Sequence, residues 1–447
     1  MTKRHGYALL AAFAALIAVL SAGIYAGVAA DDGTSTRHAT PQGGVGRTPR
    51  NNAAPASTGT WVGTWAAAPS GAEPGTETDG AAGVSVRNVV HTSVAGTSAR
   101  VTLSNLYGQE PLTVTDASVA VAAGDDTAAA ATGTLRRLTF GGSTSVTVPA
   151  GGQTVSDAVR LNVPRDTDLL VTTYSPTSSG SVTYHEHARQ TSYAAEGDSA
   201  EDMTGTPYTQ QVSYWRYLTA VDVLSNEAKG TVVAFGDSLT DGVTSTADAN
   251  HRWPDYLTAR LREAAAAGQD VPRYSVVNEG ISGNQVLLSG LGRPADNQSG
   301  LDRFGRDVLR RPNAKVVVID LGINDIGRNE KLADPDKVVA GLRTLVGEAH
   351  ARGLKVVGAT LMPFGGHRGW TAARDGVREQ INARIRAGKV FDAVVDFDKA
   401  LRDPYDPRKL RADYDSGDHL HPNDRGYREM ADVIDLSTLD GGASAKL

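Results

Sequence analysis

The chain has 447 residues, no cysteine and a formal net charge of −6. This length leaves room for two domains once non-globular ends are removed. The absence of cysteine excludes disulfide bonds, thiolate metal ligands and a cysteine nucleophile. The mildly acidic balance, with no basic block after the N-terminus, argues against a nucleic-acid partner.

The N-terminus carries an export signal. Lys3 and Arg4 precede an uncharged, alanine- and leucine-rich run over residues 6–30. Secretory signals have apolar regions of about 7–15 residues, and about 20 residues are needed to cross a bilayer. Residues 1–30 are therefore predicted to be a signal peptide or a membrane anchor, and either outcome places the following chain outside the cytosol. Residues 31–57 lack apolar periodicity and predict a disordered tether.

Short alternating runs separated by Gly, Asp, Ser and Pro follow, for example over 84–90, 99–103 and 169–174. No helical period interrupts them. This texture predicts an all-β sandwich over residues 58–228, with a jelly roll as the favoured variety.

Strand and helix patterns alternate after Gly230. One helical stretch places Trp253 and Leu257 on one face and stops at Gly268; another begins at Asp334-Pro335, a cap followed by a good first-turn residue. The predicted strands cover 231–235, 274–277, 315–320, 354–359 and 391–396. Strands joined by helical crossovers predict a parallel, three-layer α/β sheet over residues 229–447.

The sequence has four polar blocks. Three of them follow predicted strands, and the fourth precedes the last predicted helix. The first strand runs into Gly236-Asp237-Ser238, the second into a block that ends Ser282-Gly283-Asn284, and the third into Gly322-Ile323-Asn324-Asp325. The last block is Asp418-His419-Leu420-His421-Pro422. The carboxyl edge of an open α/β sheet is where such folds bind ligands.

Ester hydrolysis would need these residue types together. A serine hydroxyl such as that of Ser238 needs a base, and histidine is the usual one. Asp418, three residues before His421, would hold the imidazole. The backbone N–H groups of Ser238 and Gly283 and the side-chain amide of Asn324 would stabilise the oxyanion.

The four blocks resemble those of the SGNH, or GDSL, hydrolase family: Gly-Asp-Ser-Leu, a central glycine, Gly-x-Asn-Asp and Asp-x-x-His, in this order. The resemblance covers roughly residues 230–437, and the opening Trp61–Trp65 of the β region is similar to a subgroup of exported bacterial GDSL esterases. It implies a flavodoxin-like sheet and no metal or other cofactor. Thr240 breaks the Gly-x-Ser-x-Gly elbow of ordinary α/β-hydrolases.

Several residues have competing interpretations. His419 could replace His421 as the base, although the Asp-x-x-His spacing favours His421. Asp237 and Asp241 are interpreted as turn and helix-start residues, and Asp325 as a brace for the loop that presents Asn324. His185 and His187 share one face of a β pattern, which could be half a metal site or an interdomain contact; no third ligand is evident, so no metal site is predicted.

Two loops are candidates for the substrate pocket. Val286 and Leu287 could line an acyl pocket or pack in the core, and Trp370 could cover a substrate or be structural. The resulting hypothesis is an extracytoplasmic serine esterase acting on short acyl esters, acetyl above all, of a small molecule or carbohydrate. The alternatives are a lipase-type acylhydrolase or acyltransferase with the same residues, or a polysaccharide-binding protein with vestigial activity. The acyl group, the alcohol and the role of the β region are left open.

Overall fold

A computed structural model describes residues 59–290 and 297–441. The predicted signal or anchor over residues 1–30 and the predicted tether over 31–57 lie outside the described residues. Within the described ranges, no helix is both long and apolar enough to span a bilayer.

The first part of the described chain is all-β. Its ladders between named strands are antiparallel, and they form one sheet in the order β1-β16-β4-β10 with β9 beside β4, a second in the order β14-β13-β3-β11-β6-β7, and smaller sheets β15-β12-β2 and β5-β8. The strands are β1 (Thr60–Ala66), β2 (Gly71–Ala72), β3 (Val84–His91), β4 (Gly96–Ser104), β5 (Leu112–Val114), β6 (Asp116–Val121), β7 (Arg136–Arg137), β8 (Val146–Val148), β9 (Gln153–Val155), β10 (Val159–Val163), β11 (Asp168–Ser175), β12 (Thr183–His185), β13 (Ser192–Glu196), β14 (Gln210–Val212), β15 (Trp215–Arg216) and β16 (Leu218–Ser225).

Alternation along β11 shows why this sequence forms strands. Leu169 and Val171 belong to the main core of the β region, whereas Leu170 joins a smaller cluster with Val89 and Tyr193. Successive side chains of a strand point to opposite faces, so both faces of this strand are covered.

The second part is the expected parallel sheet, in the order β18-β17-β19-β20-β21. In chain order this is the 2-1-3-4-5 arrangement of flavodoxin-like folds, which confirms the predicted fold class. Its strands are β17 (Gly230–Gly236), β18 (Tyr274–Gly280), β19 (Ala314–Asp320), β20 (Lys355–Ala359) and β21 (Ala393–Val395). The β17 and β19 residues 232–235 and 316–319 are fully buried, as expected for strands covered on both faces.

Helices cover the parallel sheet in two groups. Helix α9 packs against α3 and α8, and in the other group α6 packs against α4 and α7, and α5 against α7. The helices are α2 (Ser238–Asp241), α3 (Trp253–Ala266), α4 (Gly300–Asp307), α5 (Ile323–Gly327), α6 (Pro335–His350), α7 (Ala372–Arg386), α8 (Phe397–Leu401), α9 (Asp424–Asp432) and the 3₁₀ turn η1 (Leu436–Leu439). Asp334 caps α6 as expected, since its side chain accepts the N–H of Asp336.

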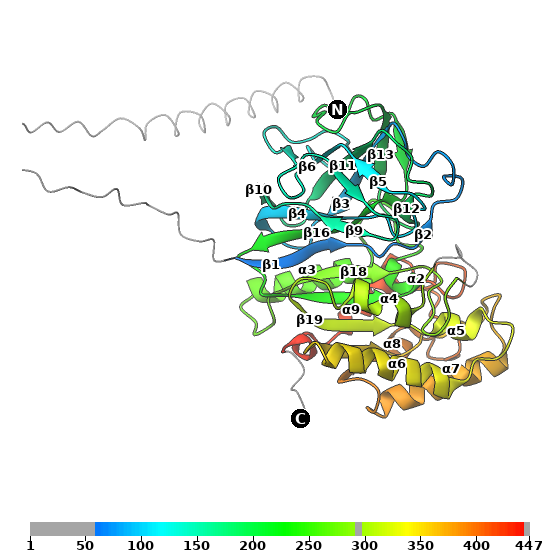
Figure 1. The fold of residues 1–447 in the computed structure, drawn as a ribbon. Coiled ribbons are helices and arrows are strands. Elements are labelled where there is room, and N and C mark those ends of the chain that lie inside the picture. The colour runs from blue at the N-terminus through cyan, green and yellow to red at the C-terminus, as the bar shows by residue number, and fades with distance from the viewer. Residues whose placement is uncertain (1–58, 291–296, 442–447) are drawn as a thin grey trace, which may run out of the picture. The chain divides into compact units, whose positions relative to one another are not determined.

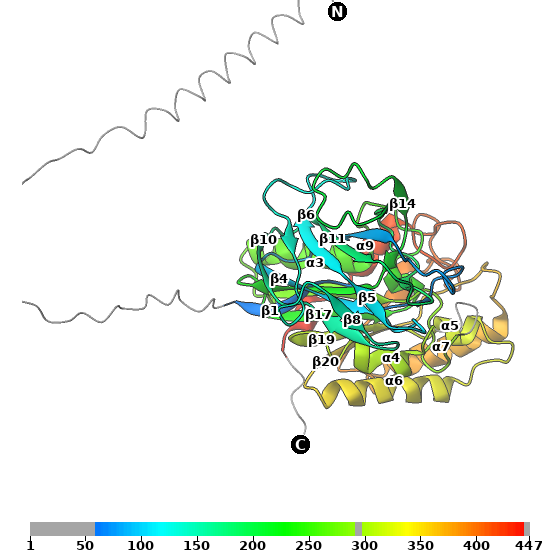
Figure 2. The ribbon, with the colours of Figure 1, turned by 45° about the horizontal axis from the view of Figure 1, so that its top comes forward.

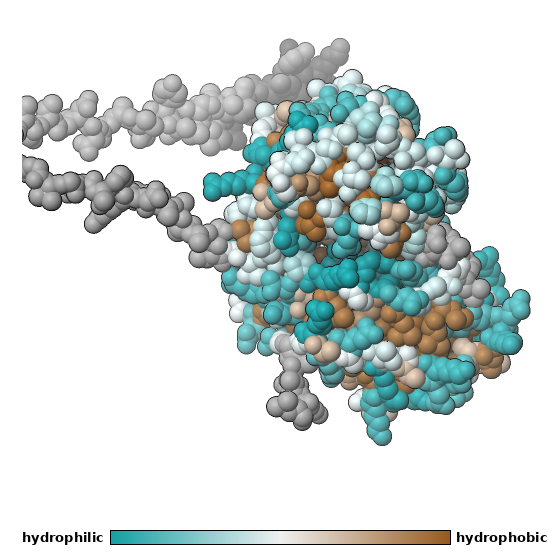
Figure 3. Space-filling model, viewed as in Figure 1, coloured by the Kyte–Doolittle hydropathy of each residue, from teal (hydrophilic) through white to brown (hydrophobic). Residues whose placement is uncertain are grey.

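The β region and the parallel sheet share buried surface. Ala66 of β1 and Ala220 of β16 belong to the same core cluster as the strands of the parallel sheet. β1 lies beside β18, as Figure 1 shows, and the N–H of Gly63 donates to Thr231 Oγ1 at 3.3 Å. Figure 2 shows β1 close to β17 from a second direction. On the face shown in Figure 3, hydrophobic residues gather over the helical part of the molecule.

Candidate active site

Ser238 lies where β17 ends and α2 begins. Asp237 caps this helix, and its side chain accepts the N–H of Leu239 at 3.1 Å. Gly236 has no room for a side chain, because a Cβ there would lie 2.2 Å from Thr240 Oγ1 and 2.5 Å from a backbone oxygen. The tight turn from strand to helix therefore places the hydroxyl of Ser238 at the carboxyl edge of the sheet.

His421 connects Ser238 to Asp418. The Oγ of Ser238 lies 2.8 Å from Nε2 of His421, and Nδ1 of the same ring lies 2.6 Å from Oδ2 of Asp418. Oδ1 of Asp418 accepts the backbone N–H groups of Leu420 and His421, at 2.9 and 2.8 Å. An ionised carboxylate only accepts hydrogen bonds, so Nδ1 carries the proton and Nε2 accepts the hydroxyl of Ser238.

Asp418 is held in its ionised form. Burial favours the protonated acid, but the hydrogen bonds from the imidazole and the backbone N–H of His421 outweigh it and keep the pKa of Asp418 below its usual range. A carboxylate in this position can stabilise an imidazolium on its neighbour.

His419 has a different partner. Its Nδ1 lies 2.6 Å from Oδ2 of Asp415, and its backbone has a φ of +65°, in the left-handed region. Its imidazole is about half exposed. Of the two histidines of this block, the structure brings His421 to Ser238.

The three predicted oxyanion donors have no acceptor within the described residues; Ser238 and Asn324 line one cavity, and Gly283 is not among the residues that line it. Neither the N–H of Ser238 nor that of Gly283 donates to a backbone acceptor there, and Nδ2 of the buried Asn324 has no partner. Gly283 has a φ of +77°, a conformation that glycine adopts without strain. Buried donors without partners are costly, so the N–H of Ser238 and the amide of Asn324, which line the same cavity, would favour an oxyanion there.

Arg328 fixes the orientation of Asn324. Its Nε donates to Oδ1 of Asn324 at 2.8 Å, one helical turn away. A guanidinium has no acceptor, so the amide oxygen must face Arg328 and the NH₂ group must face the other way. The sequence patterns did not identify this contact.

Arg303 fastens the first two blocks together. Its fully buried guanidinium donates to the carbonyls of Gly236 and Glu279, at 2.8 and 2.7 Å, and to Oδ1 of Asn284, at 3.0 Å. The ends of β17 and β18 and the residue after Gly283 are thus held by one side chain.

Asp325 braces the loop that follows Gly283. Its carboxylate accepts the N–H of Val286 at 2.8 Å and of Leu287 at 3.1 Å, and burial raises its pKa to about 6. Val286 is fully buried and packs with Leu287 at Gly341 of α6.

A cavity of about 550 Å³ opens at Ser238. Residues of the third and fourth blocks line it, together with a loop after β20 that supplies Phe364, His367 and Arg368. The three candidates for substrate binding, Val286, Leu287 and Trp370, are not among the lining residues; Gly369, the neighbour of Trp370, is.

The predicted half metal site has another explanation. Nδ1 of His185 lies 2.8 Å from the carbonyl of Ala68, and its Nε2 lies 3.0 Å from Oδ1 of Asp241 in α2. His185 therefore links the β region to α2, which follows β17. No group of three or more side chains suited to a metal ion occurs in the part of the chain that the structure describes.

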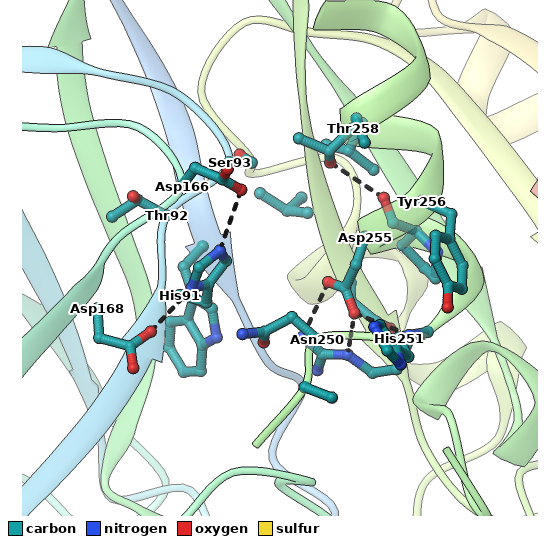
Figure 4. Close-up of a pocket in the computed structure, with 18 of the residues that line it drawn as sticks. His91, Thr92, Ser93, Asp166, Asp168, Asn250, His251, Asp255, Tyr256 and Thr258 are labelled. Carbon is teal, nitrogen blue, oxygen red and sulfur yellow. Dashed lines mark hydrogen bonds and ion pairs between the residues drawn. The ribbon is translucent and has the colours of Figure 1, made fainter. Parts of the chain in front are cut away.

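A second cavity, of about 420 Å³, lies between the β region and α3 (Figure 4). On one side, Nδ1 of His91 lies 2.8 Å from Asp168 and its Nε2 lies 3.4 Å from Asp166. Asp166 also pairs with Arg262 of α3 at 3.0 Å, and Asp255 of α3 faces His91 across the cavity. These ion pairs join the two regions away from Ser238.

One protein family matches the second region of the chain. Residues 234–429 match the model of the GDSL-like lipase/acylhydrolase family. This part of the chain is a GDSL-family hydrolase domain. Its family chemistry is ester hydrolysis, and the chain is an enzyme of that class.

Solved structures similar to the GDSL domain cover just under half of the chain. An acetylxylan esterase from Geobacillus stearothermophilus is 21% identical, with a TM-score of 0.36, and the match covers 47% of this chain and 94% of that one. A carbohydrate acetylesterase from Sinorhizobium meliloti is 19% identical, with a TM-score of 0.35, and the match covers 45% of this chain and 95% of that one. A member of the lipolytic G-D-S-L family from Veillonella parvula is 20% identical, with a TM-score of 0.34, and the match covers 45% of this chain and 94% of that one. No curated protein matches the chain.

Two residues that support the GDSL domain, Arg303 and Arg328, were missed by sequence reasoning, and His185 was singled out without its partner Asp241. Arg303 lies in α4, and Arg328 is the C-cap of α5. The four-residue spacing from Asn324 to Arg328 is a signal that could have suggested the contact between these two residues. The contact of His185 with Asp241 joins residues that are 56 positions apart, so no local pattern indicates it.

Proposed function

We propose that this chain is an exported serine esterase that hydrolyses short-chain acyl esters through Ser238, His421 and Asp418. The observation that carries the proposal is the hydrogen-bonded line from Ser238 Oγ through the imidazole of His421 to Asp418, beside three donors without an acceptor. Export is proposed from the apolar run over residues 6–30. The same run would tether the enzyme to the membrane if it were retained.

The reaction follows from the positions of these atoms. Ser238 Oγ attacks the carbonyl carbon of the ester while its proton passes to Nε2 of His421, and Asp418 stabilises the resulting imidazolium. The oxyanion receives hydrogen bonds from the N–H groups of Ser238 and Gly283 and from Asn324. The imidazolium returns the proton to the leaving alcohol; water then attacks the acyl-enzyme, with His421 again as the base, and releases the acid.

The cavity at Ser238 favours a polar alcohol. Its lining includes His367, Arg368 and Arg328 beside the reacting groups, together with the apolar side chains of Val243, Ile323, Phe364 and Leu420. The polar side chains can bind hydroxyl and other oxygen groups, such as those of a carbohydrate, and the apolar side chains can hold a short acyl group. We therefore propose acetyl or other short acyl esters of a sugar-like alcohol as substrates.

A lipid ester is the second candidate substrate, because two leucines in neighbouring loops are exposed. Leu288 and Leu332 are 52% and 53% exposed, and Leu288 adjoins the loop that Asp325 braces. A long acyl chain would gain about 0.8 kcal/mol per buried methylene. The specificity constant for p-nitrophenyl esters should therefore rise steeply with chain length for a lipase and stay highest for acetate in our proposal.

A matched pair of histidine variants tests the mechanism. Ser238→Ala and His421→Ala should abolish hydrolysis of p-nitrophenyl acetate without unfolding the protein, whereas His419→Ala should retain it, because His419 pairs with Asp415 instead. Release of acetate from acetylated xylan tests the alcohol. Full activity in Ser238→Ala would overturn the mechanism, and rates that rise with acyl length without release of acetate from the polysaccharide would move the enzyme to the lipases.

A further inference from the structure

His185 reaches from the β region into the support of the candidate active site. It ends β12, and its imidazole lies between the carbonyl of Ala68 and the carboxylate of Asp241, with both side chains almost fully buried. Asp241 ends α2, the one-turn helix that begins with Ser238. The β region therefore supplies a hydrogen-bond partner to the helix that carries the proposed nucleophile.

The hydrogen bonds define the protonation of this pair. The carbonyl of Ala68 can only accept, so Nδ1 of His185 carries a proton. Oδ2 of Asp241 accepts both the N–H of Ser282, at 2.9 Å, and its hydroxyl, at 2.5 Å. These two donors favour the ionised carboxylate, and an ionised Asp241 requires a proton on Nε2 of His185 as well. The imidazole is then an imidazolium.

The surroundings support the charged form. Burial opposes an imidazolium, but Asp241 outweighs it and raises the pKa of His185; Arg252 opposes this shift. Burial also opposes the carboxylate, yet His185, with smaller contributions from His187 and Ser282, lowers the pKa of Asp241. The ring of Trp215 lies 5.3 Å from the imidazole, within the range of a cation–π contact.

The chain of contacts continues to Gly283. Asp241 holds the N–H and the hydroxyl of Ser282, and the carbonyl of Ser282 accepts a hydrogen bond from Asn297 at 3.1 Å. That carbonyl and the N–H of Gly283 belong to one planar peptide unit. The direction of the Gly283 N–H is thus set by groups that Asp241 and Asn297 hold.

We propose that His185 is a positioning residue for ester hydrolysis, which acts through Asp241 and Ser282 to orient the N–H of Gly283 toward the oxyanion. This inference rests on the proposed function. It gives the β region a role in the reaction, although none of its residues lines the cavity at Ser238. Two of the three proposed oxyanion donors, on Ser238 and Gly283, are then connected through one carboxylate.

Two substitutions separate the two hydrogen bonds of His185. The amide nitrogen of glutamine can occupy the place of Nε2, so His185→Gln keeps a donor to Asp241. The amide nitrogen of asparagine can occupy the place of Nδ1, so His185→Asn keeps the donor to Ala68 and loses the one to Asp241. His91→Asn is the matched control, because His91 also stands at the junction of the two regions but has Asp166 and Asp168 as its partners (Figure 4).

Kinetics of the full chain with p-nitrophenyl acetate give the first readout. We expect His185→Asn to lower kcat by about ten- to a hundred-fold, which is less than the loss of an oxyanion donor, and to leave KM within about twofold because ground-state binding does not use the oxyanion contact. His185→Gln should retain most of kcat, and His91→Asn all of it. Affinity for a trifluoromethyl ketone, whose adduct with Ser238 places an oxyanion among the donors, should fall with kcat.

Amide hydrogen exchange over residues 279–286 gives a readout that needs no activity. Exchange should be faster in His185→Asn than in the wild type and unchanged in His91→Asn. If His185→Asn does not fold, Ser282→Ala removes one of the two donors to Asp241 and should lower kcat with KM unchanged.

Each failure points to one proposal. Unchanged kcat and unchanged exchange in His185→Asn would overturn the positioning role, as would an equal loss in His91→Asn, which would indicate general docking of the two regions. If the wild-type chain does not hydrolyse the ester, or if Ser238→Ala hydrolyses it equally well, the proposed function is overturned. The oxyanion role of His185 is then overturned too.

Discussion

Asn324 should matter to the transition state and not to substrate binding. Its Nδ2 is buried without a partner among the described residues and would gain one when the oxyanion forms. We expect Asn324→Ala to lower kcat by about a hundred- to a thousand-fold and to leave KM unchanged, since the contact develops with the negative charge. Steady-state kinetics with p-nitrophenyl acetate measure both constants.

Arg328 provides the graded comparison for that experiment. Arg328→Met removes the donor that orients the Asn324 amide, so its kcat should lie between those of the wild type and Asn324→Ala; Arg328→Lys should recover part of the loss. A change in KM alone for Asn324→Ala would show that Asn324 binds the substrate and would contradict its placement among the oxyanion donors.

The sequence predicted the positions of some site residues in the fold but not the contacts of others. Ser238, Asn324 and Asp418 each sit in a short block next to a strand or helix, where a local pattern indicates a position in the fold. His185 and Asp241 are 56 residues apart and belong to different regions, so no local pattern links them. Val286 shows the converse: an apolar residue after a glycine block fits a pocket wall or the core equally well, and the structure buries it against α6.

Elements were more predictable than contacts. The strands expected at 231–235 and 315–320 correspond to β17 and β19, because continuous β-branched runs bounded by turns indicate buried strands. The helix expected to end by Gly268 is α3. The interpretation of Asp241 as a helix start was wrong, because Asp241 ends α2 and Asp237 caps it. A helix of one turn has no room for an apolar period, so the sequence pattern did not show its bounds.

Gly280 of β18 lies so close to α2 that a larger residue at this position should affect both stability and catalysis. A Cβ on Gly280 would lie 2.3 Å from the backbone nitrogen of Asp241, and backbone cannot move aside without shifting α2. We expect Gly280→Ala to destabilise the protein by about 1–3 kcal/mol, as overpacking commonly does, and to lower kcat because α2 carries Ser238. Denaturant unfolding and p-nitrophenyl acetate kinetics measure the two effects.

Gly347 is the control for that substitution. It lies on an exposed face inside α6, and a Cβ there would have nothing within 4 Å. Gly347→Ala should raise the free energy of unfolding by up to about 1 kcal/mol, because alanine favours the helix. Equal stability of the two variants would show that the approach of β18 to α2 is not as tight as described.

The molecule as a whole should lose stability as the pH rises above neutral. Burial raises the pKa of Asp320 to about 7 and that of Glu279 to about 8. The pKa of His185 is also raised, since Asp241 outweighs its burial. Each group binds a proton in the folded chain at a pH where the unfolded chain has released it, and the stability this contributes is lost as the pH rises through the folded pKa. His367, whose pKa burial lowers, acts in the opposite sense only below the ordinary histidine pKa of about 6.5.

Between about pH 6.5 and 8.5, these groups therefore all change the stability in the same direction, which is a loss as the pH rises. Each proton that the folded state retains beyond the unfolded one lowers the free energy of unfolding by about 1.4 kcal/mol per pH unit. We expect Tm to be lower at the upper end of this interval than at the lower end, and the difference to shrink in His185→Gln, which has no titrating ring. Thermal unfolding of both proteins in buffers of matched ionic strength measures it. A wild-type Tm that rises over this interval would show that the buried carboxyl groups and His185 do not hold their protons in the folded chain, and would remove the imidazolium between the β region and the GDSL domain.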